Sequence, residues 1–290
     1  MGKHQAALLS IFSNSILIIF KLIAGIFMGS ISVISEALHS GIDLLASIIA
    51  FFSIREASKV PDDEHPFGHG KYENVSGFVE AILIFLAAIL IIFEAVKKIL
   101  HGATIENTGA GILVMLVATL ANFIISMLLL KIAKKTDSIA LEADGMHLLT
   151  DVFTSMGVLV GLVLVRFTGL KIIDPIAALL VAILIIKTSI DMTKKSIVDL
   201  VDSKLPEEEV NRIVDIISTY PQVKTYHKLR TRKSGQRREV DIHLKLDDST
   251  SLTEAHSLCN AVEQDIKALF PECYVLIHIE PYNNLNYSEV

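Results

Sequence analysis

Two pairs of ionisable residues recur with the same spacing in long apolar stretches of this chain. His39 and Asp43 lie in one stretch, and His147 and Asp151 lie in another. A spacing of four residues puts both members of a pair on one helix face, about one turn apart. An imidazole and a carboxylate so placed are half of a tetrahedral metal site. The two pairs together therefore predict one complete site between two helices.

The position of these pairs strengthens the prediction. Both stretches are apolar enough to cross a bilayer, where an ionisable group costs roughly 2.5–3.5 kcal/mol. The match extends one step further, since Ser47 and Ser155 each lie four residues beyond the aspartate and give H-x-x-x-D-x-x-x-S twice. A single pair is equally well explained as a buried polar bridge that locks two helices together. Two matched pairs favour the metal site over the bridge.

The chain is too apolar for an ordinary soluble protein. Of its 290 residues, 52% are hydrophobic, and the mean hydropathy is +0.55. These values indicate a protein with several membrane spans. We expect a transmembrane domain over residues 1–200, and a soluble domain over 203–290, which is rich in charged residues. The six expected spans are α-helices at about residues 8–28, 33–54, 76–100, 109–131, 141–166 and 174–195.

The basic residues predict how these spans are oriented. With six spans, more Lys and Arg fall on the side of the two termini than on the other side, and the positive-inside rule then places both termini in the cytoplasm. The residues on the terminal side are Lys3, Arg55, Lys59, Lys71, Lys131, Lys134, Lys135, Lys194 and Lys195. Those on the opposite side are Lys97, Lys98, Arg166 and Lys171. Glu80 and Glu94, inside the third span, are interpreted as interfacial or helix-packing residues.

The link between the second and third spans contains a second candidate site. It reads P-D-D-E-H-P-F-G-H-G-K-Y-E and begins at Pro61. Asp62, His65 and His69 offer one carboxylate and two imidazoles, a set compatible with zinc. By spacing alone, a solvated acidic loop with structural turns is equally probable.

The tail is predicted to alternate helices and strands in the order α-β-β-α-β. Pro206-Glu207-Glu208-Glu209 opens a helix that Pro221 stops, and Ser234-Gly235 forms a hairpin turn. The strands are expected at 223–232, 239–246 and 274–279, and the second helix at 253–269. This order predicts a small α+β fold with one antiparallel sheet and helices on one face.

Four histidines and one carboxylate give the tail its own candidate metal site. His278 and Glu280 share one face of the last strand, since strand side chains repeat every two residues. This group is denser than scattered surface histidines would be. Its members are His227, His243, His256, His278 and Glu280.

Taken together, the motifs of this chain resemble those of the cation diffusion facilitators. The chain is similar along nearly its whole length to the bacterial zinc and iron efflux members of that family. The shared pieces, in the family's order, are H-x-x-x-D in the second and fifth spans, P-D-D-E-H-P-F-G-H-G-K, H-K-L-R-T-R, D-I-H-L, E-A-H and I-H-I-E-P. Together they are specific, although each one alone is weak.

The resemblance implies a Y-shaped homodimer in the inner (plasma) membrane, with six helices per subunit and a cytoplasmic metallochaperone-like domain. It implies a transport site of His39, Asp43, His147 and Asp151, and a second site of Asp62, His65 and His69. It implies a binuclear site at the dimer contact of the tail, formed by His227, His243, His256, His278 and Glu280. It also implies an interlock between subunits made by Lys71 and Asp202.

Two positions depart from well-studied bacterial relatives. His39 stands where those relatives often have Asp, and in the family two His with two Asp accompany a preference for zinc over iron. Glu280 stands where they have Asp, so the tail carboxylate has a longer side chain.

The chemistry of the central site supports transport without the resemblance. Two carboxylates neutralise a divalent cation, and two neutral imidazoles complete a four-coordinate shell that suits Zn²⁺. Metal ligands must lose their protons to bind, so protons and metal compete for the site. We expect Zn²⁺ efflux by proton antiport with alternating access, with zinc also a structural or regulatory ligand of the tail. The expected partners are the lipid bilayer, metal ions, protons and a second copy, with no nucleic acid.

An intramembrane metalloenzyme and a metal sensor are the alternatives. A zinc hydrolase needs an open coordination position and a general base. Four ligands would close the shell here, and no H-E-x-x-H occurs in the sequence. A sensor built on the tail would not need ionisable pairs inside the membrane. We therefore expect a transporter and not an enzyme.

Overall fold

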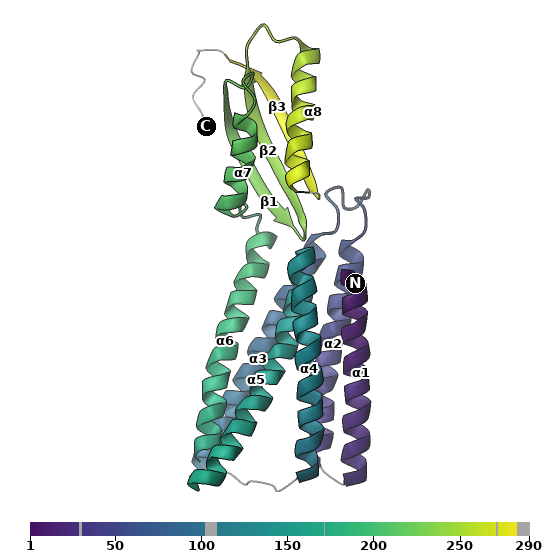
Figure 1. Cartoon of the computed structure of the whole chain (residues 1–290), viewed down its shortest axis with the longest axis vertical. Helices are drawn as coiled ribbons and strands as arrows, with labels where there is room; N and C mark the ends of the chain where they lie inside the picture. The colour runs from purple at the N-terminus through teal and green to yellow at the C-terminus, as the bar shows by residue number, and fades with distance from the viewer. Residues whose placement is uncertain (29–30, 102–108, 171, 271, 283–290) are drawn as a thin grey trace. The chain divides into compact units, whose positions relative to one another are not determined.

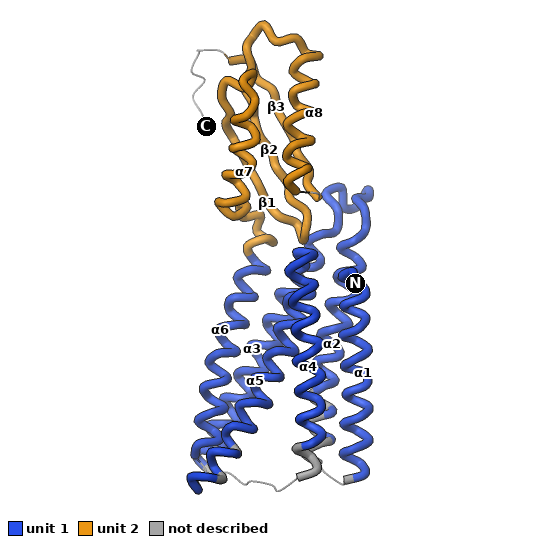
Figure 2. Tube along the Cα trace, viewed as in Figure 1, with its two compact units in different colours: residues 1–197 blue, residues 198–290 orange. Residues whose placement is uncertain are grey.

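The computed structural model describes residues 1–28, 31–101, 109–170, 172–270 and 272–282, and a few side chains inside these ranges, that of His39 among them, also lie outside the description. The chain divides into two compact units (Figure 2). The helical unit is Met1–Ile197, and the tail unit is Val198–Val290.

The helical unit consists of long helices that run alongside one another (Figure 1). They are α1 (Lys3–Met28), α2 (Ile31–Ala57), α3 (Lys71–His101), α4 (Gly109–Thr136), α5 (Ile139–Thr168) and α6 (Ile173–Leu200). Among the described residues, α1, α3, α4, α5 and α6 are long and apolar enough to cross a membrane. The 27 residues of α2 span about 40 Å at 1.5 Å per residue. The count of six spans stays a prediction.

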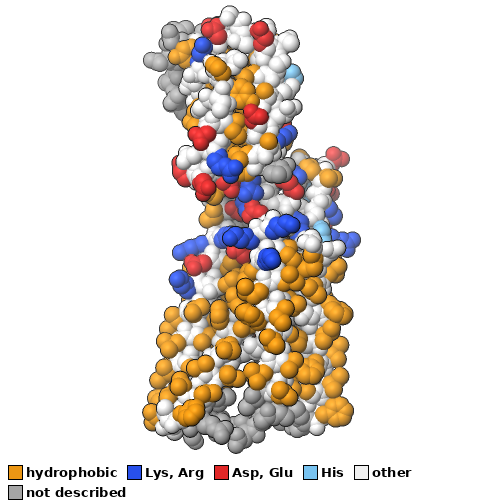
Figure 3. All heavy atoms as spheres, viewed as in Figure 1, with side chains coloured by type: hydrophobic (Ala, Val, Ile, Leu, Met, Phe, Trp, Pro, Cys, Tyr) orange, Lys and Arg blue, Asp and Glu red, His pale blue; other side chains and the backbone are white. Residues whose placement is uncertain are grey.

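The outer surface of the helical unit suits a hydrocarbon environment. Large apolar side chains such as Phe93, Leu120 and Ile183 are exposed on it. Figure 3 shows that hydrophobic side chains cover the visible face of these helices, whereas charged side chains gather at one end. A soluble protein rarely exposes an apolar surface of this extent. The exposed face therefore indicates a membrane domain.

Small residues and caps fix the helices that carry the candidate site. A Cβ atom at Gly25 on α1 would lie 2.7 Å from Ile34 Cγ1 and 3.1 Å from the Ile34 backbone nitrogen, so only glycine permits this approach of α1 to α2. Helix α5 begins after Ser138, whose side chain accepts a hydrogen bond from the Leu141 amide. It ends at Gly169, whose φ of 73° lies in the left-handed region.

The tail unit has the predicted order of elements. These are α7 (Glu207–Ser218), β1 (Thr225–Ser234), β2 (Arg237–Leu246), α8 (Leu252–Leu269) and β3 (Cys273–Pro281). They form a three-stranded sheet in the order β1-β2-β3. The prediction of a purely antiparallel sheet is wrong, because β3 pairs with β2 in parallel. Helix α8 carries the chain back along the sheet, so β3 runs in the same direction as β2.

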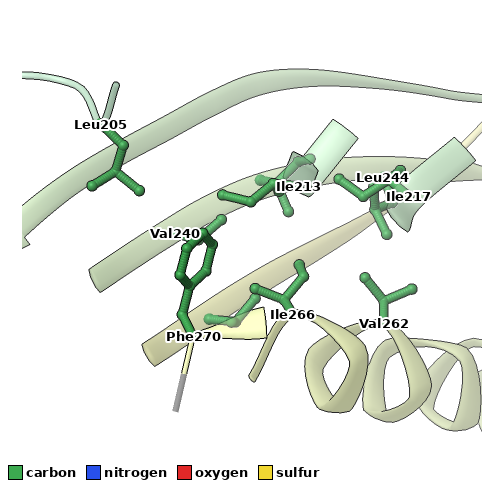
Figure 4. Packing of buried hydrophobic residues seen from close by; sticks show 10 residues of the cluster. Leu205, Ile213, Ile217, Val240, Leu244, Val262, Ile266 and Phe270 are labelled. Atoms are coloured by element: carbon green, nitrogen blue, oxygen red, sulfur yellow. The ribbon is translucent and has the colours of Figure 1, made fainter. Parts of the chain in front are cut away.

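The hydrophobic core of the tail lies on one face of this sheet (Figure 4). Val240, Ile242 and Leu244 alternate along β2 and are all buried. Ile213 of α7 and Val262 of α8 pack into the same cluster. Because strand side chains alternate between faces, His243 points to the opposite side from Ile242 and Leu244.

Removing the centre of this core should destabilise the tail unit. Ile242 is fully buried, and Ile242→Ala is expected to lower the free energy of unfolding of the tail by about 2–5 kcal/mol, through lost burial and a residual cavity. Amide hydrogen exchange of β2 in the full chain measures this change. Leu252→Ala, at a side chain that is 87% exposed, is the control and should change stability by less than about 0.5 kcal/mol. Equal protection of β2 in both variants would contradict the assigned core.

Candidate metal sites

Three of the four predicted ligands of the central site come together inside the helical unit. Asp43 of α2 and His147 and Asp151 of α5 each offer one ligand atom, and these atoms all lie within 4.8 Å of one another. Nε2 of His147 lies 3.2 Å from Oδ1 of Asp43. The side chains of Asp43 and His147 are buried. Nδ1 of His147 is buried without a hydrogen-bond partner among the described residues.

The fourth predicted ligand is His39, whose side chain lies outside the described residues. Its backbone belongs to α2, four residues before Asp43. This spacing places the two residues on the same helix face, one turn apart.

A network of polar side chains from α1, α2 and α5 supports the part of α2 that carries Asp43. Asn14 Nδ2 of α1 donates to the backbone oxygen of Asp43 at 3.5 Å and to Ser47 Oγ at 2.8 Å. Ser47 lies 2.9 Å from Ser10 Oγ and donates to Asp144 Oδ1 at 2.8 Å. Such supporting contacts fix the orientation of ligands that a metal ion would meet.

Asp144 is a buried carboxyl group that the sequence analysis missed. It lies three residues before His147 on α5, and its side chain is fully buried. The available signal was an acid one helix turn from a predicted ligand inside an apolar stretch. Glu80 of α3 is also fully buried, as a helix-packing residue would be, whereas Glu94 on the same helix is exposed.

The loop between α2 and α3 brings together the three residues of the second candidate site. Ligand atoms of Asp62, His65 and His69 lie within 4.8 Å of one another. Asp62 Oδ2 lies 3.4 Å from His69 Nε2, and Asp62 Oδ1 lies 3.5 Å from His65 Nδ1. A hydrogen bond from the backbone amide of His65 holds the pKa of Asp62 below its usual range. The carboxylate is therefore ionised and available as a ligand at neutral pH.

In the tail, the sheet aligns three histidines in one row. His227 of β1 is opposite His243 of β2, which is opposite His278 of β3. Glu280 accepts hydrogen bonds from His243 Nδ1 at 2.7 Å and from His227 Nε2 at 3.0 Å. The bond from His243 is the main cause that lowers the pKa of Glu280. His227, His243 and Glu280 offer ligand atoms within 4.8 Å of one another, and His278 Nε2 lies 3.8 Å from Glu280 Oε1.

Three other predicted site residues lie elsewhere in the two units. His256 lies on α8, is exposed, and contacts Asn260 at 3.3 Å rather than the histidine row. Asp202 belongs to the tail unit, where its Oδ2 accepts a hydrogen bond from Arg232 at 3.2 Å. Lys71 begins α3 in the helical unit.

Comparisons with known proteins agree with this architecture. The family model described as the cation efflux transmembrane domain matches residues 7–201, and that described as the cytoplasmic domain of cation efflux proteins matches residues 205–282. The chain is 33% identical over 277 residues to the cation-efflux pump FieF of Serratia proteamaculans, covering 96% of this chain and 92% of that protein. It is 34% identical over 262 residues to an uncharacterized transporter of Synechocystis, covering 90% of this chain and 84% of that protein.

Among solved structures, the metal-bound C-terminal domain of the CzcD transporter from Thermotoga maritima is 22% identical, with a TM-score of 0.26, and covers 27% of this chain and 93% of that chain. The two family models account for both units of the chain. They confirm the resemblance to the cation diffusion facilitators, which are transporters and not enzymes. The chain therefore belongs to the cation efflux family of multi-span membrane transporters.

Proposed function

We propose that this chain exports a divalent metal ion, with Zn²⁺ as the best supported cargo, in exchange for protons. The observation that carries the proposal is the cluster of Asp43, His147 and Asp151 between α2 and α5, of which Asp43 and His147 are buried. Its relatives of known name are cation-efflux pumps, which supports export. A sensor that used only the tail would have no need for this cluster.

The donor set favours zinc on chemical grounds. The carboxylates of Asp43 and Asp151 carry two negative charges, so a bound divalent ion leaves the site neutral in its apolar surroundings. His147 supplies one nitrogen, and the spacing of His39 suits a second. Two nitrogens and two carboxylate oxygens form a tetrahedral set typical of Zn²⁺.

The same residues provide the competition that an exchanger needs. His147 Nε2 lies within hydrogen-bonding distance of Asp43 Oδ1. A metal ion needs lone pairs from both atoms, so it must displace any proton shared between them. Alternating access then lets metal load from the cytoplasm and leave outward as protons enter.

The wider setting of the proposal draws on the family. We place the chain in the inner (plasma) membrane as a homodimer of six-span subunits, with both termini in the cytoplasm. The basic residues near the ends of the helices and the matched cytoplasmic-domain model support this orientation. The loop cluster around His69 and the tail cluster around Glu280 are proposed as regulatory zinc sites.

Removal of one carboxylate charge should stop transport. In Asp43→Asn the loaded site would carry a net positive charge in a low dielectric, so zinc flux into proteoliposomes should fall by more than about 100-fold. For comparison, loss of an outer-shell partner alone costs about 10–100-fold in metal affinity. Asp191→Asn, the same change at an exposed carboxylate of α6, should keep the wild-type rate. Zinc flux that persists in Asp43→Asn would place the pathway elsewhere.

Metal flux should also respond to a pH gradient. In proteoliposomes loaded with zinc-sensitive dye, an acidic compartment on the side that receives zinc should accelerate uptake, because protons displace the metal from the site after it opens there. Reversal of the gradient should slow uptake. Rates that are equal under both gradients would refute proton exchange while leaving metal transport intact.

A further inference from the structure

Two buried carboxyl groups lie in the helical unit outside the proposed metal site. Glu80 of α3 and Asp144 of α5 are both fully buried. Glu80 Oε2 and Asp144 Oδ2 each have no hydrogen-bond partner in the part of the chain that the structure describes. Neither side chain forms an ion pair with a described Lys or Arg. Two acids so placed need an explanation, since an uncompensated charge in an apolar interior is costly.

The two acids belong to helices that approach each other closely. Ala81, next to Glu80, and Ala143, next to Asp144, pack in one cluster with Met192 of α6. A Cβ atom at Gly77 of α3 would lie only 3.3 Å from Ile139 Cγ1 of α5. Glu80 and Asp144 therefore lie at the same level of these two helices. Like charges that share a site cannot both remain ionised without a cation between them.

The hydrogen bonds around each acid match a protonated carboxyl group. Ser76 donates to Glu80 Oε1 at 3.1 Å, and Ser47 donates to Asp144 Oδ1 at 2.8 Å. Each acid thus has one oxygen that accepts a hydroxyl proton and one oxygen without a partner. A buried ionised carboxylate normally accepts hydrogen bonds at both oxygens, so the oxygen that lacks a donor in each acid favours the neutral, protonated form.

The groups around the pair supply few compensating charges. The other ionisable groups near the pair on α2 and α5 are the proposed metal ligands, and His147 lies one helix turn from Asp144. Helix α1 presents Ser10 and, through Ser47, Asn14. Helix α4 has no ionisable residue between positions 113 and 130. On α6, Ser189 donates to the backbone oxygen of Ala81, and Lys195 is paired with Glu142.

We propose that Glu80 and Asp144 form a proton-binding pair that works in the transport cycle separately from the metal ligands. The inference rests on the proposed exchange of metal for protons. A proton taken from water forms one O–H bond on the pair, and the same bond breaks when the proton returns to water on the other side. Ser47 connects the pair to the helix that carries Asp43, so movement of α2 against α5 changes the contact of Asp144.

Infrared spectroscopy tests the protonation directly and does not depend on transport. The purified full chain at neutral pH should show the carbonyl stretch of protonated carboxyl groups. Glu80→Gln and Asp144→Asn should each remove intensity from this band, and Glu94→Gln, at an exposed acid on the same helix, should not. Should one variant fail to fold, the other still carries the comparison. A band that is unchanged in both would overturn the pair.

Counting protons per metal ion tests the role in transport. In proteoliposomes, Glu80→Gln and Asp144→Asn should each move one proton fewer per zinc ion. Glu80→Gln, which lies outside the polar network around Asp43, should also bind zinc with an affinity within threefold of the wild type. Glu94→Gln should keep the wild-type ratio. An unchanged ratio in both pair variants would refute the role. If the wild-type chain moves zinc without protons, the proposed exchange and this role both fail, whereas the infrared result refutes the pair alone.

Discussion

The free-energy cost of burying a charged carboxylate in an apolar interior constrains how the helical unit is built. Asp43, Asp144 and Glu80 are all buried among helices whose outer faces suit hydrocarbon. Each negative charge there needs a cation, a proton or a histidine nearby. The same requirement explains why His147 lies next to Asp43 and why a divalent ion would suit this site. In the proposed exchange, a metal ion and protons are alternative ways to neutralise these buried carboxylates.

Binding of an ion at these groups requires that the helices hold them at fixed positions. The cap at Ser138 sets where α5 begins, and the close approach at Gly25 sets the distance of α1 from α2. Hydrogen bonds from Asn14 to the Asp43 backbone and to Ser47 then hold the part of α2 that carries Asp43. In the tail, the alternation of side chains along each strand fixes the positions of the candidate ligands. It buries Ile242 in the core and leaves His243 on the other face, in register with His227 and His278.

The sequence predicted the features that depend on local spacing. A four-residue interval places His147 and Asp151 on one helix face in any helix, so the central pairs were recognisable before the structure was known. Features that depend on which elements pack together were not accessible in this way. The parallel direction of β3 depends on the path of α8, and the burial of Glu80 depends on how closely α3 approaches α5. Asp144 was missed because it lies outside the repeated motif, and only the packing of the helices shows that it is buried and bonded to Ser47.

The central claim is that one metal ion binds between α2 and α5, and anomalous X-ray scattering from crystals of the zinc-loaded full chain tests it most directly. We predict a zinc peak about 2.0–2.2 Å from carboxylate oxygens of Asp43 and Asp151 and from a ring nitrogen of His147. The histidine row of the tail provides an internal control, since a peak there shows that zinc was available. Occupied tail sites with no peak between α2 and α5 would contradict the account.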